Sequence, residues 1–179
     1  PTEVYFSPRL SEEHRRVADQ VQEGERVVDM FAGVGPFSIQ IGKNRKNVKV
    51  YAVDVNERAH HYLKKNIIAN KVENVVTPFL GDVTLLAEEL EGTADRVIMN
   101  LPERALEFVR VACRILKADG GILHFYCFES EPFPFEKAEK RLRGEVLESN
   151  RILLEIIDKR LVKQIAPRKW QVVIDALIR

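Results

Sequence analysis

The feature that most restricts the fold of this 179-residue chain is a regular alternation of short apolar runs with amphipathic helical patterns. Unbroken apolar runs of about four to eight residues are typical of strands buried on both faces, as in a parallel sheet. Helices between such strands form βαβ units, which place helices on both faces of the sheet. The pattern therefore predicts an α/β fold.

Turn signals set the expected ends of each element. Five strands are predicted, at 26–30, 48–54, 75–80, 94–99 and 121–126. Helices are predicted at 11–23, 36–42, 57–70, 105–116 and from the proline-interrupted segment 131–134 to about residue 142. Ser11 can cap the first helix and Gly24 can end it. Two β-like stretches close the chain, at 150–166 and 170–178, and their short connection predicts an antiparallel pair at the sheet edge.

Composition and charge exclude several classes of protein. Hydrophobic residues make up 45% of the chain and charged residues 31%, so we expect a single domain over residues 1–179 with one buried core. The 28 basic and 27 acidic residues leave a net charge of +1, so any RNA contact must be a local patch. No apolar stretch reaches the roughly 20 residues of a membrane span. This pattern predicts a protein that crosses no membrane.

The cysteines and histidines carry little chemical signal. Cys113 and Cys127 are expected to be reduced, buried thiols, which favours the cytoplasm. The four histidines and two cysteines lack metal-ligand spacing, so we predict no bound metal. The sequence begins at Pro1 without a methionine, and its first residues read like the inside of a folded protein, which indicates a fragment.

A glycine turn lies where the first predicted strand hands over to a helix. The segment 29–35 contains Gly33 and Gly35, which let the backbone approach a ligand closely. In an open parallel sheet this position binds nucleotide-like ligands. The turn alone is a weak signal, because Ser38 stands where a dinucleotide-binding motif has its third glycine.

Acidic residues stand at the ends of three successive predicted strands. Asp54 ends the second strand, where a carboxylate can accept hydrogen bonds from both ribose hydroxyls. Asp82 ends the third, beside the expected position of an adenine amino group. Asp29 precedes the turn, where it would repel a pyrophosphate and attract an ammonium group. Each alone can be a helix N-cap, but together they favour a ligand with adenosine, a cationic amine and a sulfonium over NAD.

With these residues the sequence resembles a class I S-adenosylmethionine-dependent methyltransferase over nearly its whole length. Three motifs, at 4–10, 29–37 and 100–102, are together similar to the archaeal and eukaryotic tRNA guanine-N1 methyltransferases. The resemblance implies a Rossmann-like sheet of five parallel strands with a C-terminal antiparallel pair. It also implies methyl transfer from S-adenosylmethionine to N1 of the guanosine 3′ to the tRNA anticodon. We expect a cytoplasmic monomer.

The resemblance assigns roles to individual residues. Methylating N1 requires a base to remove its proton, and the family places a glutamate at the position of Glu13, with Glu12 as the alternative register. A glutamate in a first helical turn is also favourable through the helix dipole alone. Arg9 is expected to support cofactor or substrate, and Asn100 and Pro102 to hold the guanine edge. An Asn and a Pro that simply end a strand would look the same.

A further set of residues is expected to bind the cofactor. These are His14, Asp29, Phe31, Gly33, Gly35, Asp54, Val55, Asn56, Asp82, Val83, Asn100 and Leu101. The chain departs from the family at His14, where an arginine is usual, and this puts a fixed positive contact in doubt. Glu103 replaces the aromatic residue of related nitrogen methyltransferases. The family's catalytic arginine, which stabilises charge on O6, comes from a segment absent from this sequence, so we expect poor methyl transfer by this chain alone.

RNA binding would need a local basic patch with aromatic groups. Candidates for phosphate contacts, each of which can equally be a solvated charge, are Lys43, Arg45, Lys46, Lys159, Arg160, Lys163, Arg168 and Lys169. Trp170 could stack on a base, and Tyr5 or Phe37 could receive a flipped guanine or belong to the core. Because the family carries upstream tRNA-binding domains, we expect weak tRNA affinity here.

Three alternatives stay open. The wybutosine-pathway aminocarboxypropyl transferase shares the fold, the donor and the glycine turn, but lacks the 100–102 motif. A nicotinamide-dependent oxidoreductase fits poorly, because Asp29 precedes the glycines and Ser38 replaces the third glycine of a dinucleotide-binding motif. A non-catalytic tRNA-binding relative can be excluded only by an activity measurement.

Overall fold

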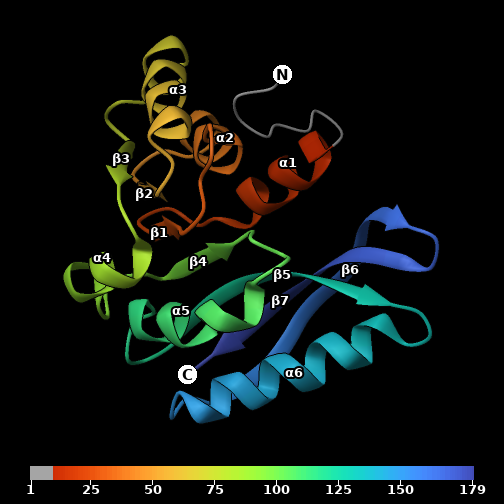
Figure 1. Cartoon of the computed structure of the whole chain (residues 1–179). Coiled ribbons are helices and arrows are strands. Elements are labelled where there is room, and N and C mark those ends of the chain that lie inside the picture. The colour runs from red at the N-terminus through yellow and green to blue at the C-terminus, as the bar shows by residue number, and fades with distance from the viewer. Residues whose placement is uncertain (1–9) are drawn as a thin grey trace. The chain divides into compact units, whose positions relative to one another are not determined.

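Two parts of the chain each form a compact unit, one up to Glu88 and one from Glu89 to Arg179. The computed structural model describes residues 10–179, shown with their helices and strands in Figure 1. The expectation of one domain over residues 1–179 stays a prediction.

The first unit is built on three parallel strands in the order β3-β2-β1. They are β1 (Arg26–Asp29), β2 (Lys49–Asp54) and β3 (Val76–Leu80). The helices are α1 (Ser11–Gln20), α2 (Pro36–Asn44), α3 (Glu57–Ala69) and, at the boundary of the units, α4 (Val83–Leu90). Val27 and Val28 of β1 are completely buried, as expected for a strand covered on both faces.

The second unit carries four strands in the order β4-β5-β7-β6. They are β4 (Arg96–Met99), β5 (Gly121–Ser130), β6 (Leu153–Ala166) and β7 (Lys169–Ile178). A short 3-10 helix, η2 (Ala105–Phe108), leads into α5 (Val109–Ile115), and α6 (Pro134–Glu148) precedes the final hairpin. β4 and β5 are parallel, whereas β7 is antiparallel to both β5 and β6. The predicted antiparallel C-terminal pair is confirmed.

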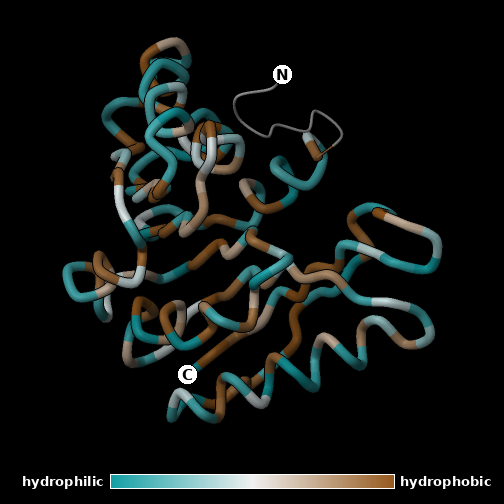
Figure 2. The backbone as a smooth tube through the Cα atoms, in the orientation of Figure 1, coloured by the Kyte–Doolittle hydropathy of each residue, from teal (hydrophilic) through white to brown (hydrophobic). Residues whose placement is uncertain are grey.

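Hydropathy explains how α6 packs in the second unit. Ala138, Leu142 and Val146, four residues apart, form its buried stripe. Hydrophilic and hydrophobic stretches alternate along the tube of the helix in Figure 2, and the helix contacts β5, β6 and β7. The hydrophobic colour of β7 agrees with its burial from Gln171 to Ala176. The amphipathic helix thus covers apolar strands that would otherwise face water.

Several predicted boundaries differ from the structure. Ser11 is the first helical residue and not the N-cap, which is Leu10 without a side-chain hydrogen bond. The helix ends at Gln20 rather than at residue 23, because Val21 is already extended. Helix α4 has no counterpart among the predicted elements, and its first turn is held by Asp82, whose Oδ1 accepts the Thr84 N–H at 2.8 Å.

In the second unit β5 and α6 are longer than predicted, whereas β4 and β6 begin later than predicted. β5 continues to Ser130 because it pairs with β7 along its whole length. α6 continues to Glu148, since Val146 extends its buried stripe by one turn. Cys113 and Cys127 are both free and buried, as predicted, and burial raises the pKa of the Cys127 thiol to about 12. This thiol therefore stays protonated at neutral pH.

Candidate functional site

The glycine turn between β1 and α2 has a conformation that requires glycine. Gly33 and Gly35 have positive φ angles of 57° and 90°. A Cβ atom on Gly35 would lie 2.5 Å from Leu63 Cδ1, and 3.2 Å from Ile39 Cγ1. Pro36 then occupies the first turn of α2, where its missing N–H costs nothing. Both the backbone angles and the space thus exclude a side chain at Gly35.

Two side chains from neighbouring elements hold this turn. Asp54, at the end of β2, accepts the Gly33 N–H on Oδ2 at 2.7 Å. Asn66 of α3 donates from Nδ2 to the Val34 carbonyl at 2.8 Å. The structure confirms neither residue as a ligand contact, but it shows that the turn is preorganised. Asn66 was missed by sequence analysis, because a helical asparagine carries no motif of its own.

Asp54 keeps hydrogen-bonding capacity after these contacts. Its Oδ1 accepts the Asn56 N–H at 2.8 Å. Each carboxylate oxygen has two lone pairs, so each can still accept one ribose hydroxyl. Asn56 itself is the N-cap of α3, and its Oδ1 accepts N–H groups from Arg58 at 2.9 Å and Ala59 at 3.2 Å. The helix cap therefore fixes the segment that carries Asp54.

The residue after Asp54 offers an exposed apolar surface. Val55 is 70% exposed, although Val53 two residues earlier is fully buried. An exposed apolar side chain beside the Asp54 carboxylate is chemically suited to one face of a flat aromatic ring. Val83 is buried in the first turn of α4, and Asp82 before it is exposed but engaged with Thr84. Phe31 is half-buried.

Asp29 is the most unusual charged group of the first unit. Its side chain is 0% exposed, and Oδ2 accepts the Ser38 hydroxyl at 2.7 Å. Oδ1 is buried without a hydrogen-bond partner among the described residues. Burial raises the pKa of Asp29 to about 7, against the opposing hydrogen bond from Ser38. A cationic group reaching this oxygen would remove an energetic penalty, which fits the expected ammonium partner.

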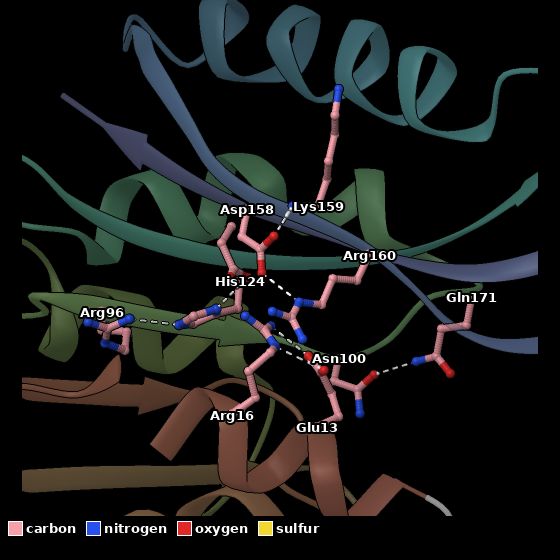
Figure 3. A network of polar contacts seen from close by, with 10 residues as sticks. Glu13, Arg16, Arg96, Asn100, His124, Asp158, Lys159, Arg160 and Gln171 are labelled. Carbon is pink, nitrogen blue, oxygen red and sulfur yellow. Dashed lines mark hydrogen bonds and ion pairs between the residues drawn. The ribbon is translucent and has the colours of Figure 1, made fainter. Parts of the chain in front are cut away.

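Glu13 lies on α1 in an ion pair that sequence analysis missed. Its side chain is 9% exposed, whereas Glu12 is fully on the surface. Arg16 donates from Nε to Oε2 at 3.0 Å and from Nη2 to Oε1 at 2.6 Å (Figure 3). The spacing of three residues along a helix is the signal that could have found this pair. The bidentate contact fixes the carboxylate plane of Glu13.

His14 does not provide the positive charge that an arginine would. Burial lowers its pKa to about 4, although the neighbouring Glu13 opposes the shift. Its ring packs edge-on against Phe37, with centroids 4.5 Å apart and planes at 75°. His14 is therefore neutral at physiological pH. Phe37 belongs to the core, at 2% exposure, rather than to a base-receiving surface.

The predicted guanine-binding segment belongs to the second unit. Asn100, Leu101 and Pro102 directly follow β4 and are half-buried, and Glu103 after them is exposed. Asn100 Oδ1 accepts a hydrogen bond from Gln171 Nε2 of β7 at 3.1 Å (Figure 3). The segment is thus tied to the sheet by a contact that the sequence does not reveal.

The basic candidates fall into two groups. Lys43, Arg45 and Lys46 lie in the first unit, but Arg45 donates to the backbone carbonyls of Ala18 at 2.8 Å and Asp19 at 2.6 Å. Arg45 therefore holds the end of α1. The other group, on the β6–β7 hairpin, we call the hairpin patch; its members are Lys159, Arg160, Lys163, Arg168 and Lys169.

Parts of the hairpin patch have acidic neighbours. Arg160 pairs with Asp158 at 2.6 Å, and Lys159 Nζ lies 3.8 Å from Glu139 and 5.7 Å from the Phe135 ring centroid. Trp170 is half-buried and donates from Nε1 to Glu131 at 3.0 Å. Trp170 is therefore oriented rather than free to swing.

Some expectations lie beyond what the structure describes. Arg9, Tyr5 and most of the 4–10 motif fall outside the described residues. Within residues 10–179, no group of three His, Cys, Asp or Glu side chains is arranged to hold a metal ion. No helix in the same range is long and apolar enough to cross a membrane.

Residues 1–154 match the model of the TRM5/TYW2 methyltransferase domain. The chain is 46% identical, over 96% of its length, to the tRNA (guanine(37)-N(1))-methyltransferase Trm5b of Pyrococcus abyssi, but covers 49% of that relative. It is 39% identical, over 97% of its length, to the tRNA(Phe) (4-demethylwyosine(37)-C(7)) aminocarboxypropyltransferase of Methanocaldococcus jannaschii, covering 68% of it.

A solved structure gives the same result for the fold. The crystal structure of M. jannaschii TYW2 in complex with AdoMet matches with a TM-score of 0.92 and 36% identity, over 99% of this chain and 78% of that one. The match confirms the predicted Rossmann-like methyltransferase fold. The chain spans about half the length of the first curated relative. The chain belongs to the TRM5/TYW2 methyltransferase domain family.

Proposed function

We propose that this chain is the catalytic domain of a tRNA guanine-N1 methyltransferase. It transfers the methyl group of S-adenosylmethionine to N1 of the guanosine 3′ to the anticodon. The observation that carries the proposal is the glycine turn locked to Asp54 beside a buried Asp29 with one unpartnered oxygen. The name of the P. abyssi relative, at 46% identity, supports the substrate.

The donor site uses residues of the first unit. Asp54 holds the ribose hydroxyls and Val55 covers the adenine. Asp29 Oδ1 receives the ammonium group, which supplies the partner that this oxygen lacks. At Gly33 an added Cβ would meet nothing within 4 Å, so the methionine chain can lie against the backbone there. Bound there, S-adenosylmethionine supplies an electrophilic methyl group on a positively charged sulfur.

The acceptor side needs a proton acceptor and a stabiliser of charge. Glu13 takes the proton from guanine N1, so that the N1 electron pair can form the new bond to the methyl carbon while the carbon–sulfur electrons return to sulfur. The Arg16 pair holds the Glu13 carboxylate in one orientation. The Asn100 amide donates to O6, where negative charge grows.

The first experiment is a calorimetric titration with S-adenosylhomocysteine, with NAD as the parallel ligand. We expect binding of the former alone. Binding of NAD alone would contradict the donor assignment. Because the chain spans half the length of its relative, transfer is then measured in single turnover at high protein concentration, with tRNA carrying guanosine or adenosine 3′ to the anticodon. Methylation of the guanosine transcript alone is expected.

Glu13 and Glu12 provide a matched pair for the role of the base. Glu13→Gln should retain S-adenosylhomocysteine binding and lose methyl transfer, since the amide cannot accept the N1 proton. Glu12→Gln, on the exposed side of the same helical turn, should change neither. Equal loss of binding and transfer in Glu13→Gln would contradict the assignment.

The aminocarboxypropyl transferase is the second candidate, and the 39% identity to that relative favours it over other enzymes. It moves a different carbon of the same donor. Mass spectrometry of the modified nucleoside distinguishes the two, because the added group is either a methyl or an aminocarboxypropyl chain. Transfer of the larger group would overturn the methyltransferase proposal. We further propose that the protein is a cytoplasmic monomer. Analytical ultracentrifugation measures the oligomeric state.

A further inference from the structure

Gln171 of β7 is a buried amide that reaches beyond the end of a shorter strand. It pairs in register with Phe128 of β5, past the point where β4 ends at Met99. No residue of β4 therefore lies in register with Gln171. Its side chain extends instead to Asn100, the first residue after β4. Gln171 is only 4% exposed, so its amide group needs a partner within the protein.

The hydrogen bond between Gln171 and Asn100 shows which atom of each side-chain amide takes part in the contact. Gln171 Nε2 donates to Asn100 Oδ1 at 3.1 Å. This hydrogen bond occupies the carbonyl end of Asn100 and leaves its Nδ2 group pointing away from Gln171, as Figure 3 shows. Asn100 Nδ2 has no hydrogen-bond partner among residues 10–179. Asn100 therefore presents donors, and not an acceptor, on its free side.

We infer that Gln171 is a positioning residue that fixes the Asn100 amide with its N–H groups toward the substrate. The inference rests on the proposed function, because guanine O6 is the acceptor that such donors suit. Without this contact, Asn100 can turn either its side-chain oxygen or its side-chain nitrogen toward the substrate. With the contact as the structure has it, Asn100 Oδ1 faces Gln171 and its Nδ2 group faces the other side, where it can stabilise charge on O6.

Hydrogen exchange of side-chain amides tests the orientation without any activity. In ¹⁵N-labelled protein, the Asn100 and Gln171 side-chain signals are assigned by their loss in Asn100→Asp and Gln171→Glu. We expect slow exchange for one Gln171 Nε2 proton and fast exchange for both Asn100 Nδ2 protons. Slow exchange at Asn100 with fast exchange at Gln171 would mean the opposite orientation and would overturn the inference.

Gln171→Glu then tests the consequence for transfer. A carboxylate at this position only accepts, so Asn100 must turn its Nδ2 toward it and its oxygen toward O6. We expect kcat to fall about 100-fold, with KM for tRNA little changed. Gln171→Met, similar in shape but without hydrogen bonds, should lose less, because Asn100 can then still sample the productive orientation.

The pH dependence separates positioning from a general loss of structure. At low pH the Glu side chain is protonated and can donate to Asn100 Oδ1 again, so the ratio of variant to wild-type kcat should rise as pH falls. Gln171→Met should show a constant ratio.

Gln164→Glu, exposed on the neighbouring strand β6, adds the same charge and should change only KM for tRNA. Equal kcat in wild type and Gln171→Glu, or a pH-independent ratio, contradicts the inference. Absence of S-adenosylhomocysteine binding by the wild type contradicts the proposed function instead, and the exchange experiment still decides the orientation.

Discussion

Asp29 links the stability of the fold to pH. Its pKa is raised from 3.8 to about 7 by burial, so between these values the folded state holds a proton that the unfolded state has released. Stability from this group is therefore present at low pH and falls as pH rises toward 7. In Asp29→Asn this decline should vanish. The unfolding free energy of the variant minus that of the wild type should therefore rise by at most about 4 kcal/mol from pH 4 to pH 8.

Urea denaturation of both proteins across this pH range measures the effect. The asparagine keeps an oxygen that can accept the Ser38 hydroxyl, so the two proteins differ mainly in titration. A difference in stability that stays constant from pH 4 to 8 would show that Asp29 has an ordinary pKa in the folded state.

Gly35 should not tolerate alanine. The added Cβ would meet Leu63 Cδ1 at 2.5 Å, at a φ of 90° that side chains avoid. We expect Gly35→Ala to lower the unfolding free energy by about 1–3 kcal/mol and to weaken S-adenosylhomocysteine binding. Gly144→Ala is the matched control: nothing lies within 4 Å of its added Cβ in α6, so it should gain about 0.5–1 kcal/mol.

Thermal denaturation and calorimetry measure both variants. If Gly35→Ala kept the melting temperature and the S-adenosylhomocysteine affinity of the wild type, Leu63 would have to move aside and the turn would accept a side chain.

At the scale of single residues, the sequence located side chains at strand ends better than it located their hydrogen-bonding partners. Asp29, Asp54 and the glycines were identified from their position at strand ends, which a parallel sheet fixes by its topology. Arg16 beside Glu13 and Gln171 beside Asn100 were not identified. The first pair lies three residues apart, but the second is separated by 71 positions and depends on the relative lengths of β4, β5 and β7.

The hairpin between β6 and β7 contains a strained residue. Ala166 pairs with Lys169, and Arg168 in the turn has a φ of 58°, which favours glycine. Arg168→Gly should therefore raise the unfolding free energy by about 0.5 kcal/mol, the balance of relieved strain and lost chain entropy. Arg168→Ala, which removes the charge but keeps the strain, should leave stability unchanged. Equal melting temperatures for the Gly and Ala variants would contradict the assigned strain.

At the scale of elements, sequence located strands and helices but misplaced their ends. Helix α4 was missed because its apolar pattern is short and its cap, Asp82, had been assigned to ligand binding. β5 was predicted too short because Cys127 to Ser130 extend it through pairing with β7, a contact between distant segments. Apolar runs identify the strands, but the partner strand determines their length.

At the scale of the whole molecule, the order of strands and helices was enough to predict the fold class. A parallel sheet with intervening helices follows from the βαβ alternation, and the short connection of 150–166 to 170–178 required an antiparallel pair. Composition contributed the charge balance of 28 basic and 27 acidic residues. This balance means that RNA binding cannot come from bulk charge.

The dependence of tRNA binding on salt should therefore report a small local patch. Each phosphate contact contributes about −0.7 to −0.9 to the slope of log K against log salt. Since Asp158 and Glu139 already face Arg160 and Lys159, we expect a slope of about −2 to −4. Fluorescence anisotropy with labelled tRNA at several salt concentrations measures it.

A double variant tests whether the hairpin patch makes these contacts. Arg168→Gln with Lys169→Gln should weaken binding and reduce the size of the slope by about 1.5, because two phosphate contacts are lost. Lys140→Gln, exposed on α6, removes a charge of the same unit outside the patch and should leave the slope unchanged. Equal changes of slope in the double variant and the control would show that only net charge affects binding. The hairpin patch would then make no phosphate contacts of its own.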